Sequence, residues 1–334
     1  MTDASATRPA LGIAFSANRG LIALPGIVAL LFLGFGVVEP NVRSWANVSN
    51  IAIQASYLAI FALAQTFVVI VRGFDLSLGA TVSLISVAAS MAMVWVEATT
   101  GSDATALLAC LATGLVIGCL VGAVNGLFVA LWRLNPFIVT LATLNIVVGF
   151  ATTISGGFQI FDVPPVLNDL FYRMPWFGLP APVVCAALLL LAAHVILTRF
   201  RLGRALYLIG SNPRAARAAG IAVPRHVMAA YVLCGITLAC GALLLTARTG
   251  SGEPNLGGSL MLESIAAAVI GGASLRGGRG SVASPLLGAL LITVMSNGMN
   301  LVRVDGYVQQ IVLGLVIVAT VAVQSRYDSR SPDR

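Results

Sequence analysis

The amino-acid sequence predicts an all-α polytopic membrane protein with about ten transmembrane helices in two inverted five-helix halves. Three observations lead to this prediction. Of the 334 residues, 58% are hydrophobic and only 9% are charged, whereas soluble domains carry about 25% charged residues. The apolar residues form runs long enough to cross a bilayer, which takes about 20 helical residues. The arginines fall mainly between alternate runs, as in membrane proteins with a defined orientation.

The apolar runs divide the chain into a transmembrane domain, 21–323, and two polar ends. Residues 1–20 are the predicted cytoplasmic N-terminal segment, and residues 324–334 are the predicted cytoplasmic tail. The first run, 21–38, is followed by no small-residue cleavage site and is expected to remain as a span. The further runs of spanning length are 48–71, 76–96, 104–131, 136–155, 180–198, 227–247, 281–302 and 306–323.

One more apolar run, 259–272, is too short to cross the bilayer unaided and is expected to be tilted or partly re-entrant. With it the count is ten, or five in each half. An odd number of spans in each half means that any internal repeat has to be inverted.

The distribution of arginine gives the predicted orientation. All 19 basic residues are arginine, and fifteen of them lie in the segments that this topology places inside. The four in outer segments are Arg43, Arg173, Arg248 and Arg303. Such an excess on one side is what the positive-inside rule describes, so both termini are expected to be cytoplasmic.

The missing lysine excludes one kind of activity. A Walker A loop needs a lysine to contact the nucleotide phosphates, and the glycine-rich stretch 271–280 contains none. We therefore expect no cofactor bound by this chain and no ATP hydrolysis by it alone. The arginines lie between apolar runs rather than on one face, which argues against nucleic-acid binding. The five cysteines and two histidines lack metal or redox spacing, and no set of catalytic side chains is apparent at mid-depth.

The central segment 199–225 contains six arginines and no acid, and it encodes a short helix. Asn212 is a suitable N-cap, Pro213 suits the first helical position, and Gly220 can end the helix in the left-handed conformation. Alanines fill the positions between these ends. Two interpretations remain open at this point: a cytoplasmic loop that only orients the protein, or a helix on which a soluble partner docks.

Five motifs occur along the chain: Gly73-Phe-Asp-Leu-Ser-Leu-Gly79, Asn135-Pro-Phe-Ile-Val-Thr-Leu141, Ser155-Gly-Gly157, Gly210-Ser-Asn-Pro213 with Ala215-Ala-Arg217 and Gly220-Ile221, and Ile265-Ala-Ala-Ala-Val-Ile-Gly-Gly272 with Gly277-Gly-Arg-Gly-Ser281. In their order and spacing they resemble the permease subunits of ATP-binding-cassette importers for simple sugars of the ribose, xylose and galactose type. The resemblance covers about residues 45–325. Arg214 and Arg276 depart from the common pattern, as does the missing proline before Ile160.

This resemblance implies a location, the bacterial inner membrane, and a set of partners. The central segment would contain the coupling helix that sits in a cleft of a cytoplasmic ATP-binding subunit, where ATP and Mg²⁺ bind. A second permease copy, giving a homodimer, would complete the path through the lipid bilayer, and a periplasmic binding protein would deliver the sugar. The residues expected to act in ATPase coupling are Gly210, Asn212, Pro213, Ala216, Arg217 and Gly220.

Polar and aromatic side chains inside the spans are candidates for the translocation path, because intramembrane polar groups usually face a cavity or a partner. Interhelical hydrogen bonding is the alternative for each of them. For Asp75 we expect an ion pair with Arg72 or an N-cap of the third span rather than contact with cargo. The path candidates are Phe67, Phe74, Asn125, Asn145, Glu263 and Asn297, with Gln54 and Gln65 as further polar groups in the second span and Asn300 in the ninth.

Other transporters are the competing interpretations. One is a branched-chain amino-acid permease of the wider superfamily, although Gly73-Phe-Asp-Leu-Ser77 and Gly210-Ser-Asn-Pro213 fit the sugar branch better. An ion-driven secondary transporter needs embedded acids or broken helices for its coupling ion, and Glu263 is the only acid well within a span. The sequence does not identify the sugar, because in this family the binding protein selects it first.

Overall fold

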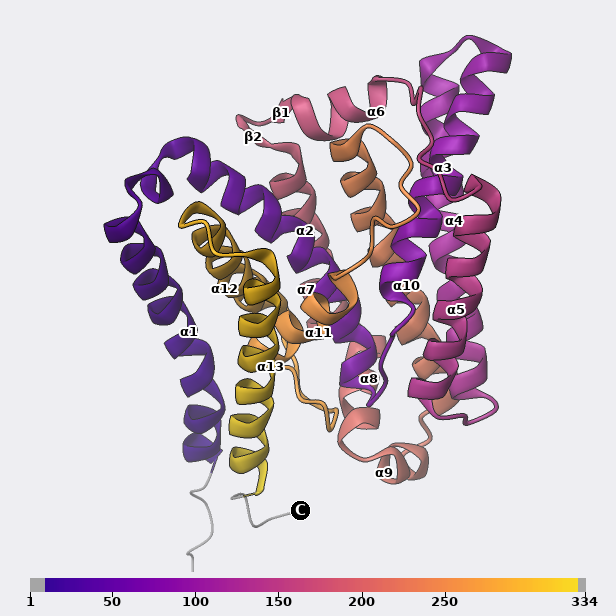
Figure 1. Cartoon of the computed structure of the whole chain (residues 1–334). Helices are drawn as coiled ribbons and strands as arrows, with labels where there is room; N and C mark the ends of the chain where they lie inside the picture. The colour runs from indigo at the N-terminus through magenta and orange to yellow at the C-terminus, as the bar shows by residue number, and fades with distance from the viewer. Residues whose placement is uncertain (1–9, 330–334) are drawn as a thin grey trace, which may run out of the picture.

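The computed structural model describes the backbone of residues 10–329 and most side chains from residue 24 to residue 322 (Figure 1). The parts of the two predicted polar ends at 1–9 and 330–334 lie outside the described residues. Almost every described element is a helix. The ten principal helices are α1 (Ala10–Val38), α2 (Trp45–Ile70), α3 (Leu78–Thr100), α4 (Asp103–Ala130), α5 (Pro136–Ser155), α7 (Ala181–Arg199), α10 (Val223–Thr249), α11 (Leu260–Ile270), α12 (Ala283–Leu301) and α13 (Gly306–Ser329).

These ten helices match the ten predicted runs one to one, which confirms the polytopic all-α fold. Among the described residues, seven of them are long and apolar enough to cross a bilayer, and the three shorter apolar stretches are 24–38, 260–270 and 306–320. The short predicted run became the 11-residue helix α11. The inverted relation between the two halves stays a prediction.

Several helices extend beyond their apolar runs. α1 begins at Ala10 rather than at residue 21, and α13 continues to Ser329, past the predicted end at 323. The reason is that hydropathy marks where a helix enters lipid, whereas helix propensity and hydrogen bonding decide where it ends. The flanking polar residues are compatible with a helix, so nothing stops it at the membrane boundary.

Helix α2 is the centre of the protein, because 89% of its most apolar 18-residue stretch is buried. It contacts α7, α10, α11 and α12. The two sequence halves interlock rather than sit apart, since α10 from the second half packs on α2, α3 and α4 of the first. The core is therefore shared between the halves.

The contact between α4 and α10 depends on facing glycines. Gly114, Gly118 and Gly122 recur every four residues on α4, and a Cβ on Gly118 or Gly122 would overlap a backbone carbonyl oxygen of α10. Gly235 of α10 is as close to the Gly118 carbonyl. Small residues at such a seam let two helix backbones approach closely, which is how helices associate inside a membrane.

We expect Gly235→Ala to lower the yield of folded protein severalfold, because the helices have to move apart and overpacking costs about 1–3 kcal/mol. The matched control is Gly149→Ala on α5, where a Cβ would meet nothing within 4 Å. Yield and melting temperature in detergent give the comparison. Equal stability of the two variants would contradict the close-packed seam.

The short elements gather at the two ends of the bundle (Figure 1). One end carries α8 (Arg201–Ser211) and α9 (Pro213–Ala218), and we call it the α9 end. The opposite end carries α6 (Val166–Asn168), η2 (Asp169–Arg173) and a hairpin of β1 (Pro175–Trp176) and β2 (Leu179–Pro180); η1 (Pro40–Arg43) links α1 to α2. Helix α1 begins and α13 ends at the α9 end.

Candidate functional site: the α9 surface and an outer pocket

Helix α9 has the capped form that the sequence predicted. The Asn212 side-chain oxygen accepts hydrogen bonds from the backbone N–H groups of Arg214 and Ala215, both at 3.0 Å. Gly220 has a φ of 79°, and the bonds from Gly220 N–H to the Arg217 carbonyl and from Ile221 N–H to the Ala216 carbonyl form a Schellman end. The helix ends at Ala218, two residues before Gly220.

The two sides of α9 differ. Ala216 is 3% exposed and packs with Ile209 and Val223, so it seats the helix against the body of the protein. Arg214 and Arg217 are exposed, and neither forms an ion pair within the described residues. The exposed side of α9 is therefore alanine-rich with two available guanidinium groups.

Helix α8, just before α9, was not predicted. Its buried residues include Ala205, Leu206 and Ile209, while Arg201 and Arg204 are exposed on the other side. This spacing of apolar residues, with arginines between them, is the signal that could have revealed an amphipathic helix. The Tyr207 hydroxyl donates to the Gly280 carbonyl at 2.7 Å, and burial raises the pKa of Tyr207.

Arg72 joins three segments next to α9. It donates from Nε to the Gly210 carbonyl and from Nη2 to the Ser211 carbonyl, both at 2.6 Å. The Gly278 N–H donates to the Ile70 carbonyl at 2.8 Å. The end of α2, the end of α8 and the glycine-rich loop 271–282 therefore meet at one junction, which we call the Arg72 junction.

Glycine is required where these backbones touch. A Cβ on Gly210 would overlap the Ile70 carbonyl oxygen, and one on Gly277 would overlap the Arg72 side chain. Gly277 and Gly278 also have φ values of 78° and 73°, in the left-handed region that favours glycine.

The expected ion pair between Asp75 and Arg72 is wrong, because Arg72 is engaged at the junction. Asp75 instead accepts hydrogen bonds from the backbone N–H and the hydroxyl of Ser77. Ser77 is the residue that precedes α3, so Asp75 holds the turn leading into that helix, two residues before the N-cap. Asp75 is buried and also lies 3.7 Å from the Cys234 sulfur of α10.

At the opposite end of the bundle, four helices surround a pocket of about 140 Å³, which we call the outer pocket. Helix α10 leads away from α9 and carries Arg248 in its last turn, and α11 carries Glu263 in its first turn. The Arg248 guanidinium lies 5.8 Å from the centre of the Tyr57 ring. The lining residues are Gln54, Tyr57, Leu58, Leu245, Arg248, Leu260, Glu263, Ile292, Thr293 and Ser296.

Comparison with known proteins identifies the family. The model of a family described as "Branched-chain amino acid transport system / permease component" matches residues 47–321. The chain belongs to this permease family. It is 36% identical to the probable ABC transporter permease protein y4mJ of Sinorhizobium fredii, over 94% of this chain and 92% of that protein.

Two further relatives have more specific names. The permease is 35% identical to the ribose import permease protein RbsC of Escherichia coli K12, over 92% of this chain and 94% of the relative. It is 32% identical to the D-allose transport system permease protein AlsC of the same strain, over 89% of each chain. No solved structure gave a significant match.

The permease brings one of the six path candidates, Glu263, to the outer pocket. Asn125 is 0% exposed and links three segments, since it donates to the Ser77 hydroxyl at 3.0 Å and accepts from the Thr143 hydroxyl at 2.7 Å. Asn297 on α12 exchanges amide hydrogen bonds with Asn47 on α2, both at 2.9 Å.

The other three candidates lie apart from the outer pocket. Asn145 is exposed on α5 and donates to the Leu141 carbonyl. Phe67 is buried in a core cluster with α7 and α8, and the carbonyl of half-buried Phe74 accepts from the Tyr231 hydroxyl at 3.1 Å. Tyr57 and Arg248 were not singled out as path residues, because an aromatic in a span and an arginine at a span end are both ordinary features of membrane helices.

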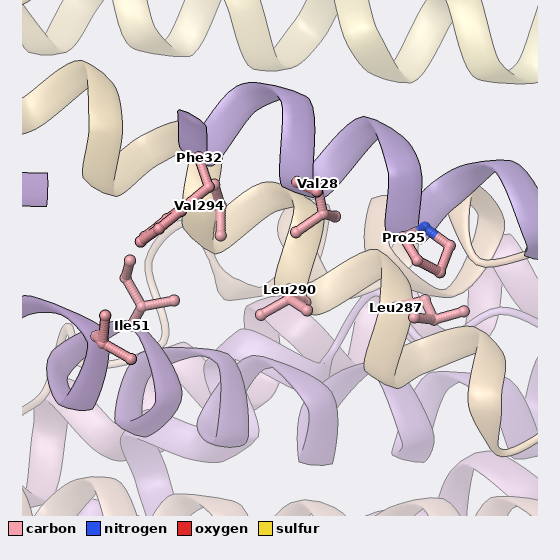
Figure 2. Close-up of a pocket in the computed structure, with 9 residues that line it drawn as sticks. Pro25, Val28, Phe32, Ile51, Leu287, Leu290 and Val294 are labelled. Carbon is pink, nitrogen blue, oxygen red and sulfur yellow. The ribbon is translucent and has the colours of Figure 1, made fainter. Parts of the chain in front are cut away.

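A second groove, larger than the outer pocket and apolar, lies between α1, α2 and α12 (Figure 2). It measures about 430 Å³, and its side chains, among them Val28, Phe32 and Leu290, carry no hydrogen-bonding group. A hydroxylated or charged solute would lose its hydration there without compensation. The groove therefore suits lipid chains rather than a polar cargo.

Proposed function

We propose that this chain forms the membrane path of an ATP-binding-cassette importer for a monosaccharide or a related polyol. The observation that carries the proposal is α9, a helix fixed at both ends that presents Arg214 and Arg217 to the solvent. It occurs in a chain whose curated relatives include permeases named for ribose, allose and galactose import. The family description mentions branched-chain amino acids, but these named relatives favour a sugar.

The α9 surface is proposed to dock on a cytoplasmic ATP-binding subunit, which supplies ATP and Mg²⁺. An alanine-rich face permits close approach, and each guanidinium offers five N–H donors to acidic groups of a partner. Because α1 begins and α13 ends at the α9 end, this docking would place both chain termini in the cytoplasm. The positive-inside distribution of arginine supports the same orientation.

The remaining partners follow from the type of importer. A second copy of the chain would face this one across the path, and a periplasmic sugar-binding protein would dock at the opposite end, near α6 and the β1–β2 hairpin. Of the six path candidates we retain Glu263 as a cargo contact, since it alone among them lines the outer pocket.

Uptake measurements with the complete importer test the proposed cargo. Proteoliposomes containing the chain, its ATPase subunit and its binding protein are offered radiolabelled ribose, galactose, allose, ribitol or leucine. We expect ATP-dependent uptake of at least one sugar or polyol and none of leucine. Uptake of leucine alone would assign the chain to amino-acid transport.

We expect the purified chain alone to show no ATP hydrolysis, because all of its basic residues are arginine and a P-loop needs lysine. Phosphate release is measured before and after addition of the ATPase subunit. Activity that persists in a preparation free of that subunit would contradict the prediction.

A further inference from the structure

We propose that the outer pocket is a binding site for a single sugar in transit, with Tyr57, Arg248 and Glu263 as its principal contacts. The inference rests on the proposed function and adds the residues that recognise the cargo. It places the site between α2, α10, α11 and α12, at the end of the bundle opposite α9.

The first argument is the Tyr57 hydroxyl. Tyr57 is 3% exposed, and its hydroxyl has no hydrogen-bond partner anywhere in the described part of the chain. Buried polar groups in proteins are nearly always hydrogen-bonded, so an unpaired hydroxyl on a residue that lines the pocket points to a partner that the described residues do not supply. A sugar hydroxyl can donate to this oxygen or accept from it.

The second argument is a pair of available charges in the same pocket. Arg248 and Glu263 are each partly buried, yet within the described residues the one ion pair is Arg173 with Asp169. The side chains of Arg248 and Glu263 form no hydrogen bond there; Arg248 contacts the Tyr57 ring instead. Partly buried ionisable groups are costly to leave unpaired, so two of them in one pocket favour a polar ligand there.

The third argument is the match between this lining and a sugar. A monosaccharide presents several hydroxyls around a ring with apolar C–H edges. The guanidinium donates, the carboxylate accepts, and Ser296, Thr293 and Gln54 can do both. The Tyr57 ring and the leucines of the lining provide apolar surface for the C–H edges. The volume of about 140 Å³ suits a small solute.

The test uses the complete importer in proteoliposomes, with the sugar that the uptake panel selects. Tyr57→Phe removes only the hydroxyl, and Glu263→Gln removes the charge while keeping the shape. Tyr307→Phe is the matched control, because Tyr307 is 78% exposed and lies outside the pocket. Maximal uptake rate, ATP hydrolysis stimulated by the loaded binding protein, and retention of the ATPase subunit are measured for each.

Both pocket variants are expected to lower the maximal uptake rate roughly tenfold, the effect of one lost hydrogen bond to a charged or buried group. Stimulated ATP hydrolysis should stay near the wild-type rate, so that less sugar moves per ATP. The control should match wild type.

Unchanged uptake in both variants would overturn the inference, and so would loss of the assembled complex in both, which would assign these groups to folding. Failure of wild type to import any sugar or polyol would instead overturn the proposed function.

Discussion

Arg217→Glu is expected to abolish sugar uptake without unfolding the membrane domain. The ends of α9 are fixed by Asn212 and Gly220, and Ala216 seats the helix, so the exposed charge at position 217 does not build the fold. Reversal would place like charges together at a contact that becomes partly desolvated on docking. Such a juxtaposition costs several kcal/mol, enough to release the ATPase subunit.

Co-purification of the ATPase subunit with the variant is the decisive measurement, together with uptake in proteoliposomes. Arg214→Glu is the matched control and should be milder. Arg214 lies in the first turn of α9, where an acid interacts favourably with the helix dipole. If Arg217→Glu retained the subunit and full uptake, α9 would be a loop that only orients the protein.

Arg72→Ala is expected to uncouple ATP hydrolysis from transport. Arg72 links the ends of α2 and α8 through two hydrogen bonds of 2.6 Å, and α8 runs directly into the docking helix. The connection from α2 to α3 carries Asp75, which holds the turn into α3. A displacement of α9 can therefore reach the core helices through the Arg72 junction, and without the guanidinium this link is lost.

The expected result is a loss of uptake of at least about tenfold, since two charge-assisted hydrogen bonds each contribute about 1.5–3 kcal/mol. The ATPase subunit should still co-purify, and ATP hydrolysis should continue without stimulation by the binding protein. Arg72→Lys should restore only part of the uptake. A lysine ammonium is a single point charge, so it can bond one of the two carbonyls, of Gly210 or Ser211, more readily than both. Arg201→Ala, at an exposed arginine of α8, is the control. Normal stimulation of ATP hydrolysis in Arg72→Ala would show that the junction is not part of the coupling route.

The sequence by itself determined the features that depend on residues close together along the chain. Lipid requires every backbone group to be satisfied within its own helix, so each apolar run had to become a helix, and ten runs became ten helices. The ends of α9 were predictable for the same reason, since a cap is formed by side chain and backbone a few residues apart. The glycines of α4 likewise indicated close packing before the partner helix was known.

Only the tertiary structure decided which distant residues meet. Arg72 is three residues from Asp75, yet it bonds Gly210 and Ser211, which lie 138 and 139 positions away. Tyr57, Arg248 and Glu263 come from three helices, and no local pattern indicates that they share a pocket. In a bilayer all lipid-facing positions are about equally apolar, so hydropathy carries little information on which helix faces which. Close packing of small residues and a few polar contacts decide that arrangement, and with it the place where a cargo can bind.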